Sequence, residues 1–317
     1  MWTLKYYTAI DEAQRKSQQK RPAVLSAFEV DDLGADSLRR RLILWVTSWL
    51  LPLVLAFFRA IWPISRFGRL IIITLDEDVR KVLSRPDVFE VPYGREMAEL
   101  AGGTNFVLGM EGAGHDRQNR IIRSVLKPED ASHVTELSRQ YTLALMRMSG
   151  GRIDAMKDLI TRVATETCID YFGLNVDDPN AFAEWAMSIS AVLFADPFGD
   201  PAVRNLSLNG SARIRATIDR SMVNPYRSPD TVLGRLLTLQ SSDPSLTDGD
   251  IRAIMVGLVT GLIPTNTLAA GKILQELLRR PEIMRNAMET ARRAVAVEAD
   301  GLATRRIRTR RRCRQFY

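Results

Sequence analysis

The sequence predicts a mainly α-helical fold with a small β component. From about position 70 to position 292, apolar residues recur three and four positions apart in one segment after another, which is the spacing of amphipathic helices. Clusters of proline, glycine and aspartate, such as "NVDDPN" and "SSDPSLTDGD", are typical of the joints between helices. The segment "RLIIIT" is rich in β-branched residues and indicates a short strand. We expect one helical domain over residues 67–292.

Composition and charge narrow the classes of function. The chain has 317 residues, of which 46% are hydrophobic, so it is long enough to bury a large core. Residues 292–317 hold nine Arg and two acidic residues, whereas the rest of the chain carries 35 basic and 35 acidic residues. A body without excess positive charge argues against a nucleic-acid-binding domain.

The Arg-rich end of the chain differs in character from the rest. Helical periodicity stops near "METARR", and we expect residues 293–317 to form a disordered tail. Out-of-frame translation of GC-rich DNA would give such a sequence, and a basic tail that binds anionic lipid or nucleic acid is the alternative. The two cysteines, Cys168 and Cys313, show no paired spacing, so the sequence predicts neither a disulfide framework nor a metal site. We expect the protein in a reducing, cytoplasmic compartment.

A hydrophobic segment precedes the helical domain. Residues 1–41 are polar and end in three consecutive Arg, and residues 42–66 are strongly apolar. A helix over residues 42–64 is long enough to reach across a hydrocarbon core about 30 Å thick. Its tryptophans suit a membrane interface, and the Arg cluster would stay on the cytoplasmic side. A membrane-associated helix and a helix that faces the core or a partner are the two interpretations.

The stretch "VGLVTGLIPTNTLAAGKILQELL" is an apolar helix interrupted by residues that disfavour a helix interior. Pro264 has no N–H to donate to the carbonyl of Thr260, so that carbonyl is freed, and Gly261 lets a group approach the backbone. We therefore expect a small-ligand site here. Its other groups would be Thr265, Asn266 and Thr267. A proline-kinked core helix without a ligand is the alternative.

Four segments, taken in order, resemble the cytochrome P450 family of haem-thiolate monooxygenases. They are "VRKVLSRPDVFEV", "GMEGAGHDRQNRIIRSVL", "RVATETCIDYFGL" and "LTDGDIRAIMVGLVTGLIPTNT", and the last looks like the long helix that crosses the haem face. The resemblance covers residues 70–292 and implies the N-terminal half to two-thirds of that fold. It also implies haem and iron binding, an apolar organic substrate and a redox partner in complete relatives.

The resemblance implies roles for residues of the long helix. Gly261 falls on the family's small residue beside the iron, and Thr265 falls on the catalytic threonine that helps deliver protons to bound dioxygen. Pro264 stands where the family usually has an acid, which puts ordinary dioxygen activation in doubt.

A second implied role concerns the haem propionates. His115 matches the family's propionate-binding histidine, but the arginine expected four residues later is Asn119 here. Arg120 or Arg117 must then take that role, and we favour Arg120.

The sequence holds no counterpart of the family's Gly-rich loop with its thiolate cysteine. Cys313 has no glycines around it, and Cys168 stands in a helical segment where it is expected to be a small buried apolar residue. We therefore expect a C-terminally truncated family member without monooxygenase turnover, whose haem binding is in doubt. The alternative is a non-catalytic, membrane-associated helical protein that binds an apolar ligand or a partner.

Overall fold

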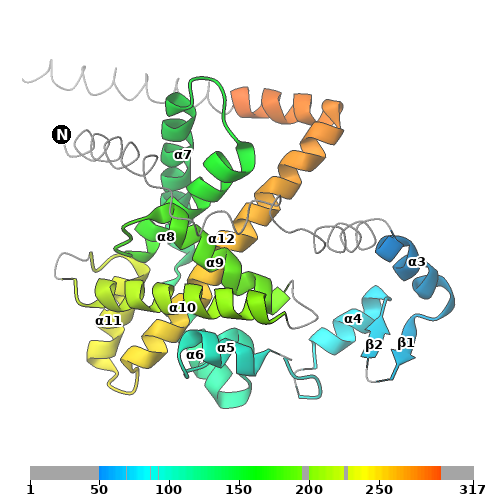
Figure 1. Cartoon of the computed structure of the whole chain (residues 1–317), viewed down its shortest axis with the longest axis horizontal. Coiled ribbons are helices and arrows are strands. Elements are labelled where there is room, and N and C mark those ends of the chain that lie inside the picture. Colours follow the sequence, from blue (N-terminus) through cyan, green and yellow to red (C-terminus); the bar gives the residue numbers. More distant parts are fainter. Residues whose placement is uncertain are drawn as a thin grey trace, which may run out of the picture. The chain divides into compact units, whose positions relative to one another are not determined.

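The computed structural model describes residues 50–293, apart from 69, 86, 92, 195–199 and 225–227 (Figure 1). These residues form two compact units, which divide between Phe89 and Glu90, inside the domain predicted over 67–292. The predicted polar segment over 1–41, the first eight residues of the hydrophobic segment and the Arg-rich tail from residue 294 lie outside the described residues.

The first unit combines two helices with a β-hairpin. Its elements are α3 (Leu51–Ile61), β1 (Ile64–Phe67), β2 (Leu70–Ile73) and α4 (Asp76–Leu83). The two strands are antiparallel, and Ile64 pairs with Ile73. The predicted strand in "RLIIIT" is confirmed as β2. The helix predicted to reach residue 64 instead ends at Ile61, because Pro63 follows and the chain enters β1.

The second unit is helical, which confirms the predicted fold class. Its helices are α5 (Gly94–Ala101), α6 (Gly112–Val125), α7 (Ala131–Met148), α8 (Arg162–Phe172), α9 (Pro179–Phe194), α10 (Pro201–Met222), α11 (Val232–Ser242) and α12 (Asp248–Arg279). Three shorter helical elements are the 3-10 turns η3 (Val107–Gly109) and η4 (Pro128–Asp130) and the π-helix η5 (Ala155–Thr161). Residues 281–293 are also helical.

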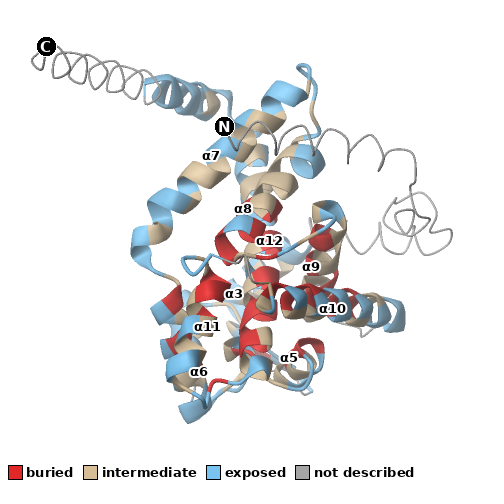
Figure 2. Cartoon of the chain, turned by 90° about the vertical axis from the view of Figure 1, so that its left-hand side faces the viewer, coloured by how far each residue is buried: buried red, intermediate tan, exposed pale blue. Residues whose placement is uncertain are grey.

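Helix α12 carries the centre of the core. It begins with a capping box, in which the backbone N–H of Asp250 donates to Thr247 Oγ1 at 3.1 Å and the N–H of Thr247 donates to Asp250 Oδ2 at 2.9 Å. Figure 2 shows buried residues concentrated on α12 and on the helices around it. Among the described residues, α12 alone is long and apolar enough to cross a membrane, and 56% of its most apolar window is buried inside the protein. That burial identifies a core helix.

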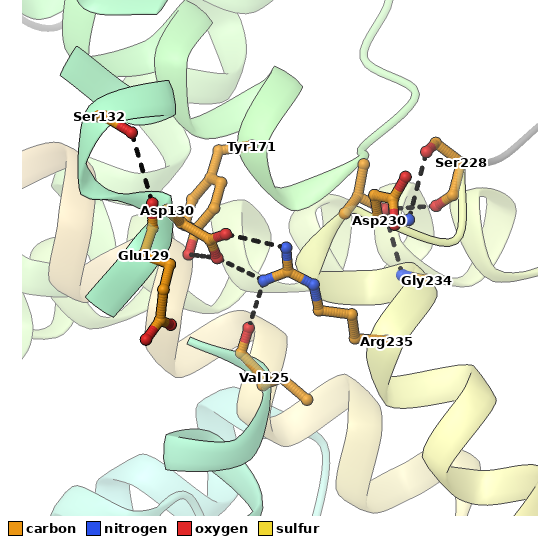
Figure 3. A network of polar contacts seen from close by, with 10 residues as sticks. Val125, Glu129, Asp130, Ser132, Tyr171, Ser228, Asp230, Gly234 and Arg235 are labelled. Atoms are coloured by element: carbon orange, nitrogen blue, oxygen red, sulfur yellow. Dashed lines mark hydrogen bonds and ion pairs between the residues drawn. The ribbon is translucent and has the colours of Figure 1, made fainter. Parts of the chain in front are cut away.

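A charged network joins four segments of the second unit (Figure 3). The Arg235 guanidinium of α11 donates to both carboxylate oxygens of Asp130 in η4 and, at 2.8 Å, to the carbonyl of Val125 at the end of α6. The Tyr171 hydroxyl of α8 donates to Asp130 Oδ2 at 2.9 Å. The carboxylate and the guanidinium are only 15% and 18% exposed, so the network fixes these four segments relative to one another.

Candidate functional site

The break in α12 is present, and a neighbouring helix compensates for it. Pro264 is buried inside α12 and offers no N–H to the carbonyl of Thr260. The Ser190 hydroxyl of α9 donates to that carbonyl at 3.1 Å instead. The prediction that Pro264 frees the carbonyl is confirmed. Ser190 uses one acceptor position of this carbonyl, and a role of the carbonyl in ligand binding stays a prediction.

The polar groups of "PTNT" do not converge on one site. Thr265 and Asn266 are exposed, whereas Thr267 is 3% exposed and its Oγ1 finds no hydrogen-bond partner in the described part of the chain. Residues two apart in a helix lie about 200° apart around its axis, so Thr265 and Thr267 face nearly opposite directions. The expected cluster of two hydroxyls, an amide and a carbonyl is therefore wrong.

Ser190 replaces the hydrogen bond that Pro264 removes from the helix. Substitutions at these two positions should therefore have non-additive effects on the free energy of unfolding. Ser190→Ala should lower the free energy of unfolding by about 1–2 kcal/mol, because a buried carbonyl loses its donor. In the Pro264→Ala background, alanine supplies the missing backbone N–H, and the same change should cost less than about 0.5 kcal/mol. Urea denaturation of the four proteins measures the coupling. Equal costs in both backgrounds would show that Ser190 does not compensate for the proline.

Two glycines of α12, one turn apart, have opposite surroundings. A Cβ added to Gly257 would lie 2.3 Å from Cγ of Phe106, so the Phe106 ring packs directly on the backbone there. A Cβ added to Gly261 would meet no atom within 4 Å. Gly257 is therefore a packing position, and Gly261 is an open position on the same helix.

The open position continues along α12 as an exposed strip. Gly261, Thr265 and Leu268 follow one another at spacings of four and three, so they share one side of the helix, and all three are exposed. Leu268 is 64% exposed. The strip offers access to the backbone at Gly261, one hydroxyl at Thr265 and an apolar side chain.

The residues predicted to bind propionates do not share one side of α6. His115 has a side chain 40% exposed, with Nδ1 3.2 Å from Asp116 Oδ1, and Arg120 is exposed. Five residues along a helix correspond to about 140° around its axis, so the two side chains diverge. Arg117 donates to Ser245 Oγ at 2.8 Å and lies 3.6 Å from Asp243 Oδ2, so it is engaged by the turn that precedes α12.

The described part of the chain contains one cysteine, Cys168, and its surroundings do not suit an iron ligand. Cys168 is fully buried in α8, where burial raises the pKa of its thiol and keeps it protonated. Its predicted role as a small buried apolar residue is confirmed. Cys313 lies outside the described residues. Within residues 50–293, as far as they are described, no group of three or more His, Cys, Asp or Glu side chains is placed to hold a metal ion.

The sequence did not reveal which residues contact the backbone of α12. Ser190 and Phe106 come from segments far from α12 in the chain, and no local pattern marks either of them. Gln118, only 5% exposed, donates from Nε2 to the carbonyl of Asn105 at 3.1 Å and so holds the loop that carries Phe106. Gln118 stands between Arg117 and Asn119 in the sequence, so no local pattern marked it either.

Comparison with known proteins identifies the fold. No protein-family model and no curated protein matches the sequence. The crystal structure of CalO2 aligns with a TM-score of 0.62 at 18% identity over 75% of this chain and 62% of its own. P450BioI in complex with a hexadec-9Z-enoic acid ligated acyl carrier protein aligns with a TM-score of 0.60 at 16% identity, over 73% of this chain and 62% of its own. Epothilone B-bound cytochrome P450epoK aligns with a TM-score of 0.59 at 16% identity, over 72% of this chain and 61% of its own.

This chain therefore spans about three fifths of the length of these structures. The structures that it resembles are cytochrome P450s, and the likeness agrees with the order of segments in the sequence. The chain has the cytochrome P450 fold over about three quarters of its length.

Proposed function

We propose that the chain is the N-terminal part of a haem-dependent monooxygenase of the cytochrome P450 family. The observation that carries the proposal is the exposed strip at Gly261 and Thr265, which begins directly after the buried turns of the central helix of this fold. Haem held by a thiolate supplies the insertion of oxygen into an apolar substrate in complete relatives. A redox partner and an apolar organic substrate belong to the same proposal.

The residues of this chain have defined parts in the proposal. Gly261 would leave room for the group beside the backbone of α12, and Thr265 would offer a hydroxyl that can hold or pass a proton at Oγ1. His115 and Arg120 remain the predicted partners for carboxylates, one on each side of α6. Pro264 leaves no acid beside Thr265, so a proton would have to reach Oγ1 from water on the exposed side of α12.

We further propose that this chain by itself performs no monooxygenase turnover. The sequence contains no Gly-rich loop around a cysteine, and Cys168 is buried away from solvent. An absorbance spectrum of the purified chain with added haem, reduced under carbon monoxide, tests this. We expect no red-shifted thiolate-type Soret band. Such a band would overturn the proposal and would point to Cys313 as the ligand.

Haem binding itself is tested by titration, independently of turnover. Gly261→Leu should weaken haem binding at least about tenfold, because a side chain then covers the open position. It should not lower the free energy of unfolding, because its Cβ meets no atom within 4 Å and leucine is a better helix former than glycine. Leu278→Ala, also at an exposed position of α12, is the matched control and should bind as the parent does. Equal binding by the parent and Gly261→Leu would show that haem does not lie on this strip.

A further inference from the structure

A small cavity lies between α5, α9 and α10 of the second unit (Figure 1). It is lined by Glu96, Glu99 and Leu100 of α5, Val192 of α9, and Arg204 and Leu208 of α10. Its volume is about 10 Å³, which is the space that a single water molecule or another group of that size needs. None of these lining residues belongs to α12, so the cavity is separate from the strip at Gly261.

Contacts between α5 and α10 fix the walls of the cavity. Arg215 of α10 donates from Nη1 to the carbonyl of Leu100 at 2.6 Å, and the buried Ser211 hydroxyl donates to the same carbonyl. Arg204 of α10 forms an ion pair with Glu99, and the two side chains are 47% and 41% exposed. Leu100, in contrast, is buried. The cavity is therefore preformed, and it meets solvent beside the ion pair.

One oxygen atom of the lining has no hydrogen-bond partner. Glu96 Oε2 is shielded from solvent, and no donor in the described part of the chain reaches it. Arg204, the cation of the lining, is engaged by Glu99. Two carboxylates and one guanidinium give the lining a formal charge of −1. A carboxylate oxygen that has left water without gaining a donor destabilises the fold until a donor reaches it. The cavity therefore lacks one cationic donor of about the size of a water molecule.

Charge and shape select the ligand. Glu96 and Leu100 are four residues apart in α5, so they share one side of that helix. Arg204 and Leu208 of α10 are related in the same way. Charged and aliphatic side chains thus line the cavity together. A divalent metal ion finds no group of three or more acidic, His or Cys side chains in the described residues. A primary ammonium group is compact, carries a positive charge and offers three donors.

We propose that the cavity binds the ammonium group of an apolar primary amine, and that the Glu96 carboxylate selects this group. The amine nitrogen donates to Glu96 Oε2, and the apolar part of the amine lies against the aliphatic side chains of Val192 and Leu208. Only the nitrogen has to enter the cavity, because the volume matches one such group. The site is independent of haem binding, so failure of either proposal leaves the other standing.

The test is isothermal titration calorimetry of the full chain with n-hexylammonium chloride, hexan-1-ol or sodium hexanoate at equal ionic strength. We expect n-hexylammonium to bind at least about tenfold more tightly than hexan-1-ol, and hexanoate not to bind. Glu96→Gln should weaken binding of n-hexylammonium at least about tenfold, because the amide keeps the shape of the side chain and loses its charge. Glu282→Gln, at an exposed position of the helical segment 281–293, is the matched control and should bind as the parent does.

A second variant tests the position of the ligand. Leu208→Phe fills the cavity and leaves Glu96 intact, and it should weaken binding of n-hexylammonium as much as Glu96→Gln does. Parent-like binding by this variant would place the amine elsewhere. Circular dichroism of each variant checks that loss of binding does not come from unfolding.

Four further results would overturn the proposal. Parent-like binding by Glu96→Gln would show that the carboxylate does not select the ligand. Equal affinities for hexan-1-ol and n-hexylammonium would show an apolar cavity that ignores charge. Binding of ammonium chloride as tightly as n-hexylammonium would assign the cavity to an inorganic cation. An equal loss in Glu282→Gln would show general electrostatic attraction instead of a site.

Discussion

Replacing Gly257 by alanine is expected to lower the free energy of unfolding of the second unit by about 3 kcal/mol. The added methyl group would lie 2.3 Å from the Phe106 ring, and an aromatic ring packed at 7% exposure cannot turn aside as the end of a flexible side chain can. Either α12 or the loop that carries Phe106 must shift. Urea denaturation followed by circular dichroism measures the change.

Gly261 provides the matched control for this experiment. Gly261→Ala places the same methyl group one turn along the same helix, where it meets no atom within 4 Å. The change should therefore stabilise the protein by about 0.5–1 kcal/mol, the usual gain of alanine over glycine in a helix. Opposite signs at the two positions are the expected result. Equal destabilisation would show that the exposed strip at Gly261 is closed.

A second variant isolates the contact between the ring and the glycine. Phe106→Ala alone should cost about 3 kcal/mol through loss of a buried ring. In the Gly257→Ala background the same change should cost clearly less, because it also removes the clash. Additive costs would show that Gly257 is needed for a reason other than Phe106.

The second large effect is expected at Arg235. Arg235→Met should cost about 3 kcal/mol, because it leaves the carboxylate of Asp130 mostly buried without its cation and removes the donor to the Val125 carbonyl. Adding Asp130→Asn to Arg235→Met should recover part of this loss. Arg220→Met breaks an exposed ion pair with Asp177 and serves as the control, with an expected cost below about 1 kcal/mol.

The same network predicts how stability depends on pH. Hydrogen bonds from Arg235, with a smaller contribution from Tyr171, lower the pKa of Asp130 from 3.8 to about 2. A carboxyl group whose pKa is lower in the folded state stabilises the protein above its unfolded pKa. This contribution should be complete above pH 4 and should be lost as the pH falls toward 2.

Tyr171 makes the stability of the fold depend on pH in the alkaline range. Burial, and then the hydrogen bond to Asp130, raise the pKa of its hydroxyl from 10.0 to about 12. The neutral phenol is favoured in the folded protein, so its contribution is present below pH 10 and is lost as the pH rises toward 12. Unfolding curves of the parent and of Tyr171→Phe across both ranges check this. The Phe variant should lack the alkaline loss.

The sequence by itself determined the features that depend on local periodicity. The helical segments, the strand at Leu70–Ile73 and the interruption at Pro264 all follow from the spacing of apolar residues or from the chemistry of one residue type. Four segments, taken in order along the chain, resemble the cytochrome P450 family, and that resemblance implied the fold. The strand β1 was missed because its residues, Ile64–Phe67, continue an apolar run whose pattern fits a helix equally well.

The tertiary structure alone decided which groups meet. Ser190 reaches the carbonyl of Thr260 across 70 residues of sequence, and Arg235 reaches Asp130 across 105. Gly257 and Gly261 are the same residue type in the same helix, yet only packing against Phe106 makes one of them closed and the other open. A sequence pattern reports which side of a helix is apolar. It does not report what lies against that side, because the partner comes from a distant segment and is fixed only when the helices pack.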